Sequence, residues 1–160
     1  MRKLKLELEL VPATSFNMNL RNNFSSEDWD IIRRLVYKRA GHRCEICDTT
    51  GRMSAHEIWD YVESDSGNFV TLAGLICLCD DCHMCKHWGY AQMQADVGKL
   101  DMVSLEKHFM KVNSCRKTTL EKHKAISFAE WNRRSSLEWQ LNIDYLGSFL
   151  DEELDKRGIS

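Results

Sequence analysis

Two pairs of cysteines have the spacing of metal-binding knuckles. Cys44 and Cys47 form one C-x2-C pair, and Cys79 and Cys82 form a second pair, with 31 residues between the two pairs. Each pair can present two thiolates to one ion. Four thiolates complete the tetrahedral shell that a structural Zn²⁺ prefers, with no coordination position left open for chemistry. The spacing therefore predicts a structural zinc shared by these four cysteines.

The other cysteines are expected to lie outside that shell. The chain has seven cysteines, an odd number, and six of them lie between Cys44 and Cys85. Such a cluster argues against a secreted disulfide framework and favours a metal site in a reducing compartment. Cys77 and Cys85 lie close to the second pair in sequence, but the strand and the helix that carry them would point them elsewhere. The isolated Cys115 is expected to be a structural thiol.

Three histidines and a glutamate form a second candidate cluster. His56 and Glu57 lie in the middle of a candidate strand. His83 and His87 are four residues apart on the helix expected after the second cysteine pair, so they share one of its faces. Such a set can hold one divalent cation and leave room for phosphate oxygens and water, and a neutral histidine beside water can act as a general base near pH 7. These residues therefore indicate a hydrolytic site.

The first 40 residues are expected to supply a strand and a helix. Leucine alternates with charged residues from Leu4 to Leu10, which is the period of a half-buried strand, and Pro12 ends it. Residues 25–28, Ser-Ser-Glu-Asp, provide a cap and an acidic first turn for a helix that stops near Gly41. The apolar residues of this helix fall on one side, namely Trp29, Ile32, Leu35 and Val36.

Two strands and a helix are expected to position the cysteines and histidines. Turn-rich sequence surrounds candidate strands at about 53–62 and 69–78, and a helix is predicted from Asp80 or Asp81 through His83 and His87 to Ala91. Further helices are predicted at about 104–112 and from a capping box at 118–121 to the region 131–139. A short extended stretch at 141–145 and a solvated acidic tail follow.

The composition is that of an ordinary soluble protein. Hydrophobic residues make up 43% of the chain and charged residues 29%, and no apolar run approaches the roughly 20 residues that a membrane span needs. Residues 1–5 alternate apolar with charged side chains and lack the apolar stretch of a signal peptide. We therefore expect a cytoplasmic protein without a membrane partner.

The charge distribution favours a polyanionic partner. The net charge is only −2, but residues 1–43 hold nine Lys or Arg against five Asp or Glu, and residues 101–134 hold eight against four. The segment 44–100 between them is acidic, with three against nine. Two basic flanks around a metal-type centre suit a nucleic acid, and solvated helix faces are the alternative. The candidate phosphate contacts are Arg33, Arg34, Lys38, Arg39, Arg43, Arg116, Lys117, Arg133 and Arg134.

Between about Gly41 and Gly89 these motifs resemble the zinc-containing HNH endonucleases. The matching pieces are the first knuckle, the segment 54–59 (Ser-Ala-His-Glu-Ile-Trp), and the second knuckle followed at once by His83 and then by Lys86-His87. The resemblance implies a ββα-metal core and a hydrolase that cleaves DNA. One divalent ion would polarise the scissile phosphate, and it is Mg²⁺, Mn²⁺, Ni²⁺ or Zn²⁺ depending on the member.

The resemblance also implies roles for the histidines. His56 would be the general base, His83 a metal ligand, and His87 a second ligand or a phosphate contact. Many members carry a metal-binding Asp or His directly before the base, where this chain has Ala55. A register shifted by one would make His56 the ligand and would put Glu57 in the base position. Because successive strand residues point to opposite faces, His56 and Glu57 do not share a site unless a bulge intervenes.

These observations predict one α+β domain over residues 1–160. It comprises an HNH core at about 41–95, an N-terminal strand and helix at 1–40, a helical flank at 101–146 and an acidic tail at 147–160. The expected activity is hydrolysis of DNA with Mg²⁺ or Mn²⁺, in the cytoplasm of a bacterial or phage-infected cell. The alternative is a non-catalytic zinc module that binds nucleic acid or a protein partner. A zinc deaminase is a weaker rival, because its signature needs His-x-Glu while His56 and Glu57 are adjacent.

Overall fold

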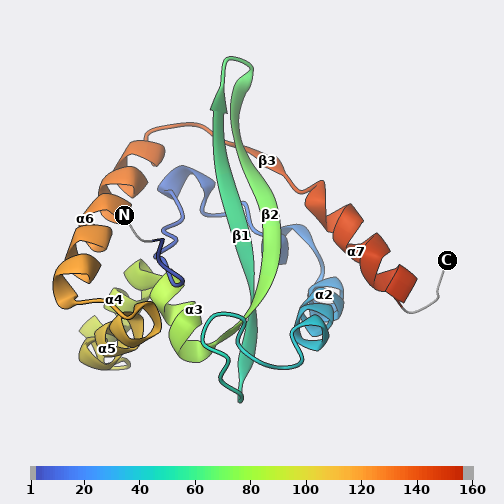
Figure 1. The fold of residues 1–160 in the computed structure, drawn as a ribbon. Coiled ribbons are helices and arrows are strands. Elements are labelled where there is room, and N and C mark those ends of the chain that lie inside the picture. Colours follow the sequence, from blue (N-terminus) through green and yellow to red (C-terminus); the bar gives the residue numbers. More distant parts are fainter. Residues whose placement is uncertain (1–2, 157–160) are drawn as a thin grey trace.

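A long antiparallel hairpin forms the centre of the molecule (Figure 1). In the computed structural model, which describes residues 3–156, β1 (Met53–Ser64) pairs with β2 (Gly67–Cys79), and β3 (Gln140–Asn142) joins the other edge of β2 in parallel. The hairpin register runs from Met53 opposite Cys79 to Ser64 opposite Gly67, with one irregularity between Ile58 and Trp59. Both predicted strands are confirmed, and each is slightly longer than expected because the turn at 64–67 is tight.

Helices lie on both sides of the hairpin, α3 to α6 on one side and α2 and α7 on the other (Figure 1). The molecule therefore has the mixed α+β class that the sequence predicts. Within residues 3–156, no helix is long and apolar enough to cross a membrane. The helical elements are η1 (Ala13–Ser15), α1 (Leu20–Asn23), α2 (Ser26–Arg39), α3 (Asp80–Lys86), α4 (Trp88–Asp96), α5 (Met102–Asn113), α6 (Lys117–Arg134) and α7 (Tyr145–Lys156).

Each side of the hairpin has its own apolar core. On the side of α3 to α6, residues from the N-terminal segment, β2 and the helices pack together, including Leu6, Leu78, Trp88, Phe109 and Leu120. On the other side α2, β2 and α7 pack together, with Trp29, Val36, Leu72, Cys77 and Phe149 among the buried residues. Strand β2 therefore contributes side chains to both cores, whereas the outer part of β1 is exposed.

Helix α2 follows the sequence prediction closely. The Ser25 hydroxyl caps it by accepting a hydrogen bond from the Asp28 amide. Its predicted apolar side is buried, and the chain leaves the helix at Gly41, whose φ of +61° suits a residue without a Cβ. Local signals were sufficient here because the cap, the apolar stripe and the stop lie within one stretch of chain.

The predicted N-terminal strand is wrong. Leu6 and Leu8 are buried while Lys5 and Glu7 are exposed, as the alternation predicts, but Glu9 is only partly exposed and the segment pairs with no strand. The Asn113 side chain on α5 instead accepts hydrogen bonds from the Lys5 and Leu6 amides, at 2.8 and 3.0 Å, and donates to the Leu6 carbonyl. His123 on α6 accepts from the Leu8 amide. Side chains of distant helices thus satisfy the backbone groups that a sheet would have paired.

Two helix predictions and the prediction of a solvated acidic tail need correction. The helix expected from Asp80 to Ala91 is broken at His87, whose ψ of 48° ends α3 before α4 begins. Helix α6 starts at Lys117 without a side-chain cap, so the capping box at 118–121 does not form. Most of the predicted acidic tail is α7, because Leu146 and Phe149 share a buried face while its acidic residues mostly point outward. Residues 157–160 of that tail lie outside the described residues.

Candidate metal centre

The four predicted cysteine ligands form one cluster. The sulfurs of Cys44, Cys47, Cys79 and Cys82 all lie within 4.8 Å of one another, and those of Cys47 and Cys79 are 3.6 Å apart. All four cysteines are free thiols. The cluster is therefore placed to hold a metal ion such as zinc. Cys77, Cys85 and Cys115 lie outside it, as expected, and the first two are fully buried in the apolar cores.

Local backbone geometry positions the two knuckles. Cys79 ends β2 and serves as the N-cap of α3, where its sulfur accepts from the Cys82 amide at 3.5 Å. Glu45 fastens the first knuckle to β2, because its amide donates to the Cys77 carbonyl and its carboxylate accepts from the Cys77 amide at 2.7 Å. The cluster thus joins the loop at 44–52, the end of the hairpin and the first turn of α3.

The electrostatics of the cluster are compatible with a bound cation. Burial, together with the neighbouring Cys47 and Cys44 sulfurs, raises the pKa of the Cys79 thiol to about 12. Burial and the charges of the other three cysteines raise the pKa of Cys82 further. Four thiolates this close together would repel one another, and a bound Zn²⁺ would offset that repulsion and displace the thiol protons. The donor set therefore fits the ion that the spacing predicts.

His108 on α5 contacts this cluster from outside. Its Nε2 lies 3.1 Å from the Cys82 sulfur, and its Nδ1 is 3.9 Å from an Asp81 oxygen. An imidazole N–H bonded to a ligand sulfur helps to orient and stabilise the thiolate. Sequence reasoning missed His108, because a single histidine on an amphipathic helix 26 residues after Cys82 carries no motif.

The three predicted histidines form a second cluster. The ligand atoms of His56, His83 and His87 lie within 4.8 Å of one another, and the ring centroids are 4.7 to 5.4 Å apart. His56 comes from the middle of β1, His83 from α3, and His87 from the break between α3 and α4. Only 5% of His56 is exposed, while His83 and His87 are half-buried. The structure therefore brings together, at one site, residues 31 positions apart in sequence.

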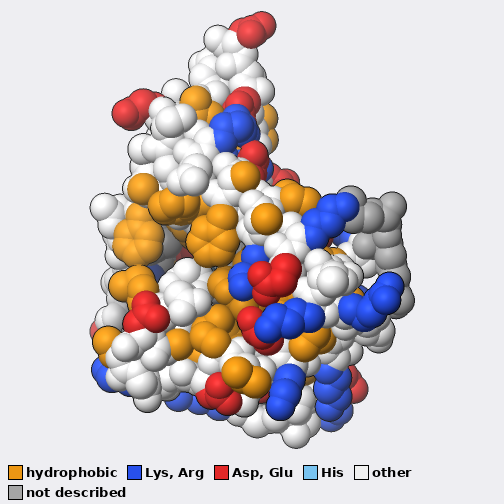
Figure 2. Space-filling model, turned by 90° about the vertical axis from the view of Figure 1, so that its left-hand side faces the viewer, with side chains coloured by type: hydrophobic (Ala, Val, Ile, Leu, Met, Phe, Trp, Pro, Cys, Tyr) orange, Lys and Arg blue, Asp and Glu red, His pale blue; other side chains and the backbone are white. Residues whose placement is uncertain are grey.

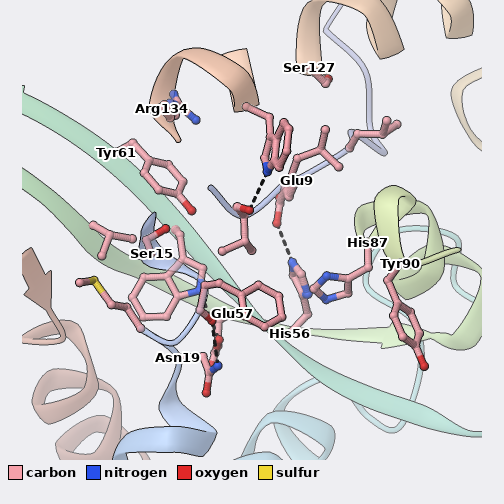
Figure 3. Close-up of a pocket in the computed structure, with 18 of the residues that line it drawn as sticks. Glu9, Ser15, Asn19, His56, Glu57, Tyr61, His87, Tyr90, Ser127 and Arg134 are labelled. Atoms are coloured by element: carbon pink, nitrogen blue, oxygen red, sulfur yellow. Dashed lines mark hydrogen bonds and ion pairs between the residues drawn. The ribbon is translucent and has the colours of Figure 1, made fainter. Parts of the chain in front are cut away.

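Glu9 completes this cluster and was not predicted. One oxygen of its carboxylate lies 2.6 Å from His56 Nε2 (Figure 3). The other oxygen lies 2.5 Å from the Lys86 ammonium. Burial would raise the pKa of Glu9, but the hydrogen bond and charge of His56 and the charge of Lys86 outweigh it, so the pKa falls. An ionised carboxylate only accepts hydrogen bonds. The Nε2 atom of His56 therefore donates the hydrogen bond to Glu9.

His83 and His87 are neutral at physiological pH. Burial, with the nearby charge of His56, lowers the pKa of His83 to about 4 and that of His87 to about 3. Neutral imidazoles have a lone pair for a cation, whereas imidazolium ions have none. His83 and His87 are thus in the neutral form, which can bind a metal ion.

Glu57 is not part of the histidine cluster, although it lines the same cavity. Strand alternation turns it to the opposite face of β1, where its carboxylate accepts from the Leu20 amide at 2.8 Å and from Trp59 Nε1 at 3.2 Å. Burial raises its pKa despite these two bonds. Of the two adjacent strand residues, His56 lies beside His83 and His87, whereas Glu57 accepts a hydrogen bond from the first residue of α1.

The histidines lie at one end of a cavity of about 740 Å³. The N-terminal segment, β1, α4 and α6 form its walls, and Figure 3 shows Tyr61, His56 and His87 around it. The lining is rich in aromatic residues, namely Phe16, Trp29, Trp59, Tyr61, Tyr90 and Trp131. Hydrophobic side chains also gather on the outer face that carries α4, α5 and α6 (Figure 2). A ligand of moderate size thus has access to the histidine cluster.

Most of the predicted phosphate contacts are engaged elsewhere. Arg34, Lys38 and Arg116 are exposed, and only Arg134 lines the large cavity. Arg21, which was not among the predicted contacts, lines both this cavity and a smaller one of about 390 Å³ beside His83. The ion pairs are Arg33–Asp30, Arg39–Glu45, Arg43–Asp48, Lys117–Glu106, Arg133–Glu63 and Arg134–Glu130.

Comparison with known proteins adds no relative to this description. No family model matches the chain, and no curated protein or solved structure matches it significantly. The function is therefore inferred from the two side-chain clusters themselves.

Proposed function

We propose that this protein is a metal-dependent endonuclease of the HNH type, which hydrolyses phosphodiester bonds of DNA. The supporting observation is the convergence of His56, His83 and His87 in one cluster, with His83 next in sequence to Cys82 of the four-cysteine cluster. In this proposal β1, β2 and α3 are the ββα-metal core. Zinc in the cysteine cluster is structural, because four thiolates leave no open coordination position.

His83 and His87 are the proposed ligands of the catalytic ion. They are neutral and half-buried, and their nitrogens belong to one cluster. Imidazole suits borderline ions such as Ni²⁺ and Zn²⁺ better than Mg²⁺, which prefers oxygen. When bound, the ion polarises the scissile phosphate and stabilises the leaving oxygen.

His56 is the proposed general base. Glu9 accepts the hydrogen bond from its Nε2, which leaves Nδ1 free to take a proton from the attacking water. The resulting imidazolium is stabilised by the Glu9 carboxylate, in the way that the acid of a catalytic triad supports its histidine. The ion pair with Lys86 helps to keep Glu9 ionised, so that near neutral pH the Glu9 carboxylate can support His56 as the base.

The cysteine cluster acts on this site through the backbone. Cys82 and His83 are consecutive residues in the first turn of α3. An ion held by Cys82 fixes that turn against the hairpin, and thereby fixes where the His83 ring lies relative to His56. The metal-loaded cysteine cluster therefore has a positioning role in addition to its contribution to stability.

The test is cleavage of supercoiled plasmid by zinc-loaded protein with added Mg²⁺, Mn²⁺, Ni²⁺ or Zn²⁺. We expect His56→Ala and His83→Ala to abolish cleavage. His42→Asn is the matched control, because His42 is exposed and has a φ of 56° that asparagine tolerates. Intact plasmid with every ion would contradict the proposal and favour a non-catalytic zinc module. Loss of the second ion in His56→Ala, measured by calorimetry, would make His56 a ligand in place of a base.

A further inference from the structure

The proposed cation site is recessed. His56 is 5% exposed, and the cavity that leads to it is enclosed by the N-terminal segment on one side and α6 on another. A volume of about 740 Å³ lies within the roughly 300–1,000 Å³ of pockets that enclose a small organic molecule. A nucleotide with its base turned out of the helix enters such a space. A base-paired duplex is stiff, so its phosphate backbone does not reach a cation site at the bottom of a pocket.

The walls of the cavity suit nucleobases. Phe16 is 68% exposed and Tyr90 53% exposed, so both line the cavity while keeping much of their surface open to a ligand. Aromatic side chains stack on every base, because every base has a π-face. Several polar groups of the lining already have partners, including the Glu57 carboxylate and the Trp131 indole N–H, which donates to the Val11 carbonyl. Recognition by stacking is therefore favoured over recognition by hydrogen bonds to a particular base.

The surface charge is poorly arranged for a duplex. Non-specific duplex binding relies on several Lys or Arg side chains that contact successive phosphates. Six of the nine candidate contacts are in ion pairs with carboxylates, and the net charge of the chain is −2. Arg21 lines both the large cavity and the smaller one beside His83, and thus can meet the phosphate of a strand that enters there.

From the recessed site, the aromatic walls and the paired basic residues, we infer that the substrate is single-stranded DNA. An unpaired base stacks in the cavity between the N-terminal segment and α4, and its phosphate reaches the histidine cluster. The inference rests on the proposed nuclease function for the identity of the reacting group. The binding it describes can be measured without cleavage.

The experiment compares a fluorescein-labelled oligothymidylate of 12 nucleotides with a labelled 12-base-pair duplex. Fluorescence anisotropy is recorded with zinc-loaded protein, without chelator and without added divalent ion. We expect the single strand to bind at least about tenfold more tightly than the duplex. Phe16→Ala and Tyr90→Ala should each weaken the single-strand complex by about tenfold, the typical loss of one base-stacking contact. Phe128→Ala is the matched control, because Phe128 on α6 is 37% exposed and does not line the cavity.

Equal affinity for the two DNA forms would overturn the inference, and so would unchanged single-strand affinity in both aromatic variants. Incubating the same oligonucleotides with Mn²⁺ or Ni²⁺ separates this result from the nuclease proposal. Selective binding without cleavage would contradict the nuclease and leave the cavity assignment intact. Cleavage of the duplex alone would retain the nuclease and reject the single-strand substrate.

Discussion

Glu9→Gln tests the contacts that hold the histidine cluster. The substitution preserves the shape of the side chain and an oxygen that accepts from His56, but it removes the negative charge beside Lys86. Only 8% of the Lys86 side chain is exposed, and Glu9 is the carboxylate with which it pairs. The variant therefore leaves a buried ammonium ion without its counter-ion, while the hydrogen bond to His56 can persist.

The expected loss in the free energy of unfolding is about 3 kcal/mol. Breaking a buried ion pair by removing one partner costs about 3–5 kcal/mol, and the lower end applies because 32% of the Glu9 side chain meets water. Lys86→Met removes the ammonium, so the double variant Glu9→Gln/Lys86→Met should be more stable than Glu9→Gln alone. Such coupling between contacting residues typically reaches about 0.5–3 kcal/mol.

Urea unfolding at pH 7, followed by the fluorescence of the five tryptophans, measures these differences in zinc-loaded protein. Glu7→Gln is the matched control, since Glu7 is exposed two residues earlier in the same segment, and it should change stability by less than about 0.5 kcal/mol. The reasoning is refuted if Glu9→Gln is as stable as the control and the double variant shows no coupling. Lys86 would then be hydrated despite its burial.

Three further outcomes are expected. Purified protein should contain about one tightly bound zinc per chain by elemental analysis. Cys44→Ser should lose this zinc and Cys115→Ser should keep it. Equal zinc content in the two variants would contradict the proposal that the four cysteines bind the ion. In protein without a catalytic ion, the free energy of unfolding should fall as the pH decreases from about 6.5 to about 4. Over that range unfolded chains protonate His83 and His87 while the folded protein, with pKa values of about 4 and about 3, does not. At pH 5 each histidine therefore lowers the free energy of unfolding by about 2 kcal/mol. His87→Gln should flatten this slope in pH-dependent urea titrations, and an unchanged slope would place the protonation elsewhere. Glu57→Gln should retain plasmid cleavage, because Glu57 lies on the other face of β1; loss of cleavage with the fold intact would return Glu57 to the role of base.

The features that could be predicted from sequence are those determined by short-range pattern. The cysteine spacing identified the four-sulfur cluster, because two tight knuckles leave few ways to use four thiols. The cap at Ser25 and the apolar stripe of α2 lie within about four helical turns, and the hairpin strands have a turn between them. The i, i+4 spacing also brought His83 and His87 together, although the helix breaks at the second of them.

The features that were missed depend on distant partners. Glu9 reaches His56 across 47 positions, and the alternating leucines around it pointed to a solvent-facing side chain. Asn113 replaces the strand partner of the N-terminal segment from 107 residues away. Neither contact can be predicted from the neighbouring sequence, because each depends on how α3, α5 and the N-terminal segment pack together. The acidic character of 147–160 likewise concealed the apolar face of α7, which packs beside α2 and β2.

The shortest strand has a consequence for association between molecules. An uncovered apolar strand edge is a template for pairing with a second chain. On β2 that edge carries Phe69 and Val70, and β3 occupies it through the pairs Phe69–Gln140 and Val70–Leu141. The link between α6 and α7 therefore covers part of the β2 edge that would otherwise be open to pairing with a strand of a second molecule.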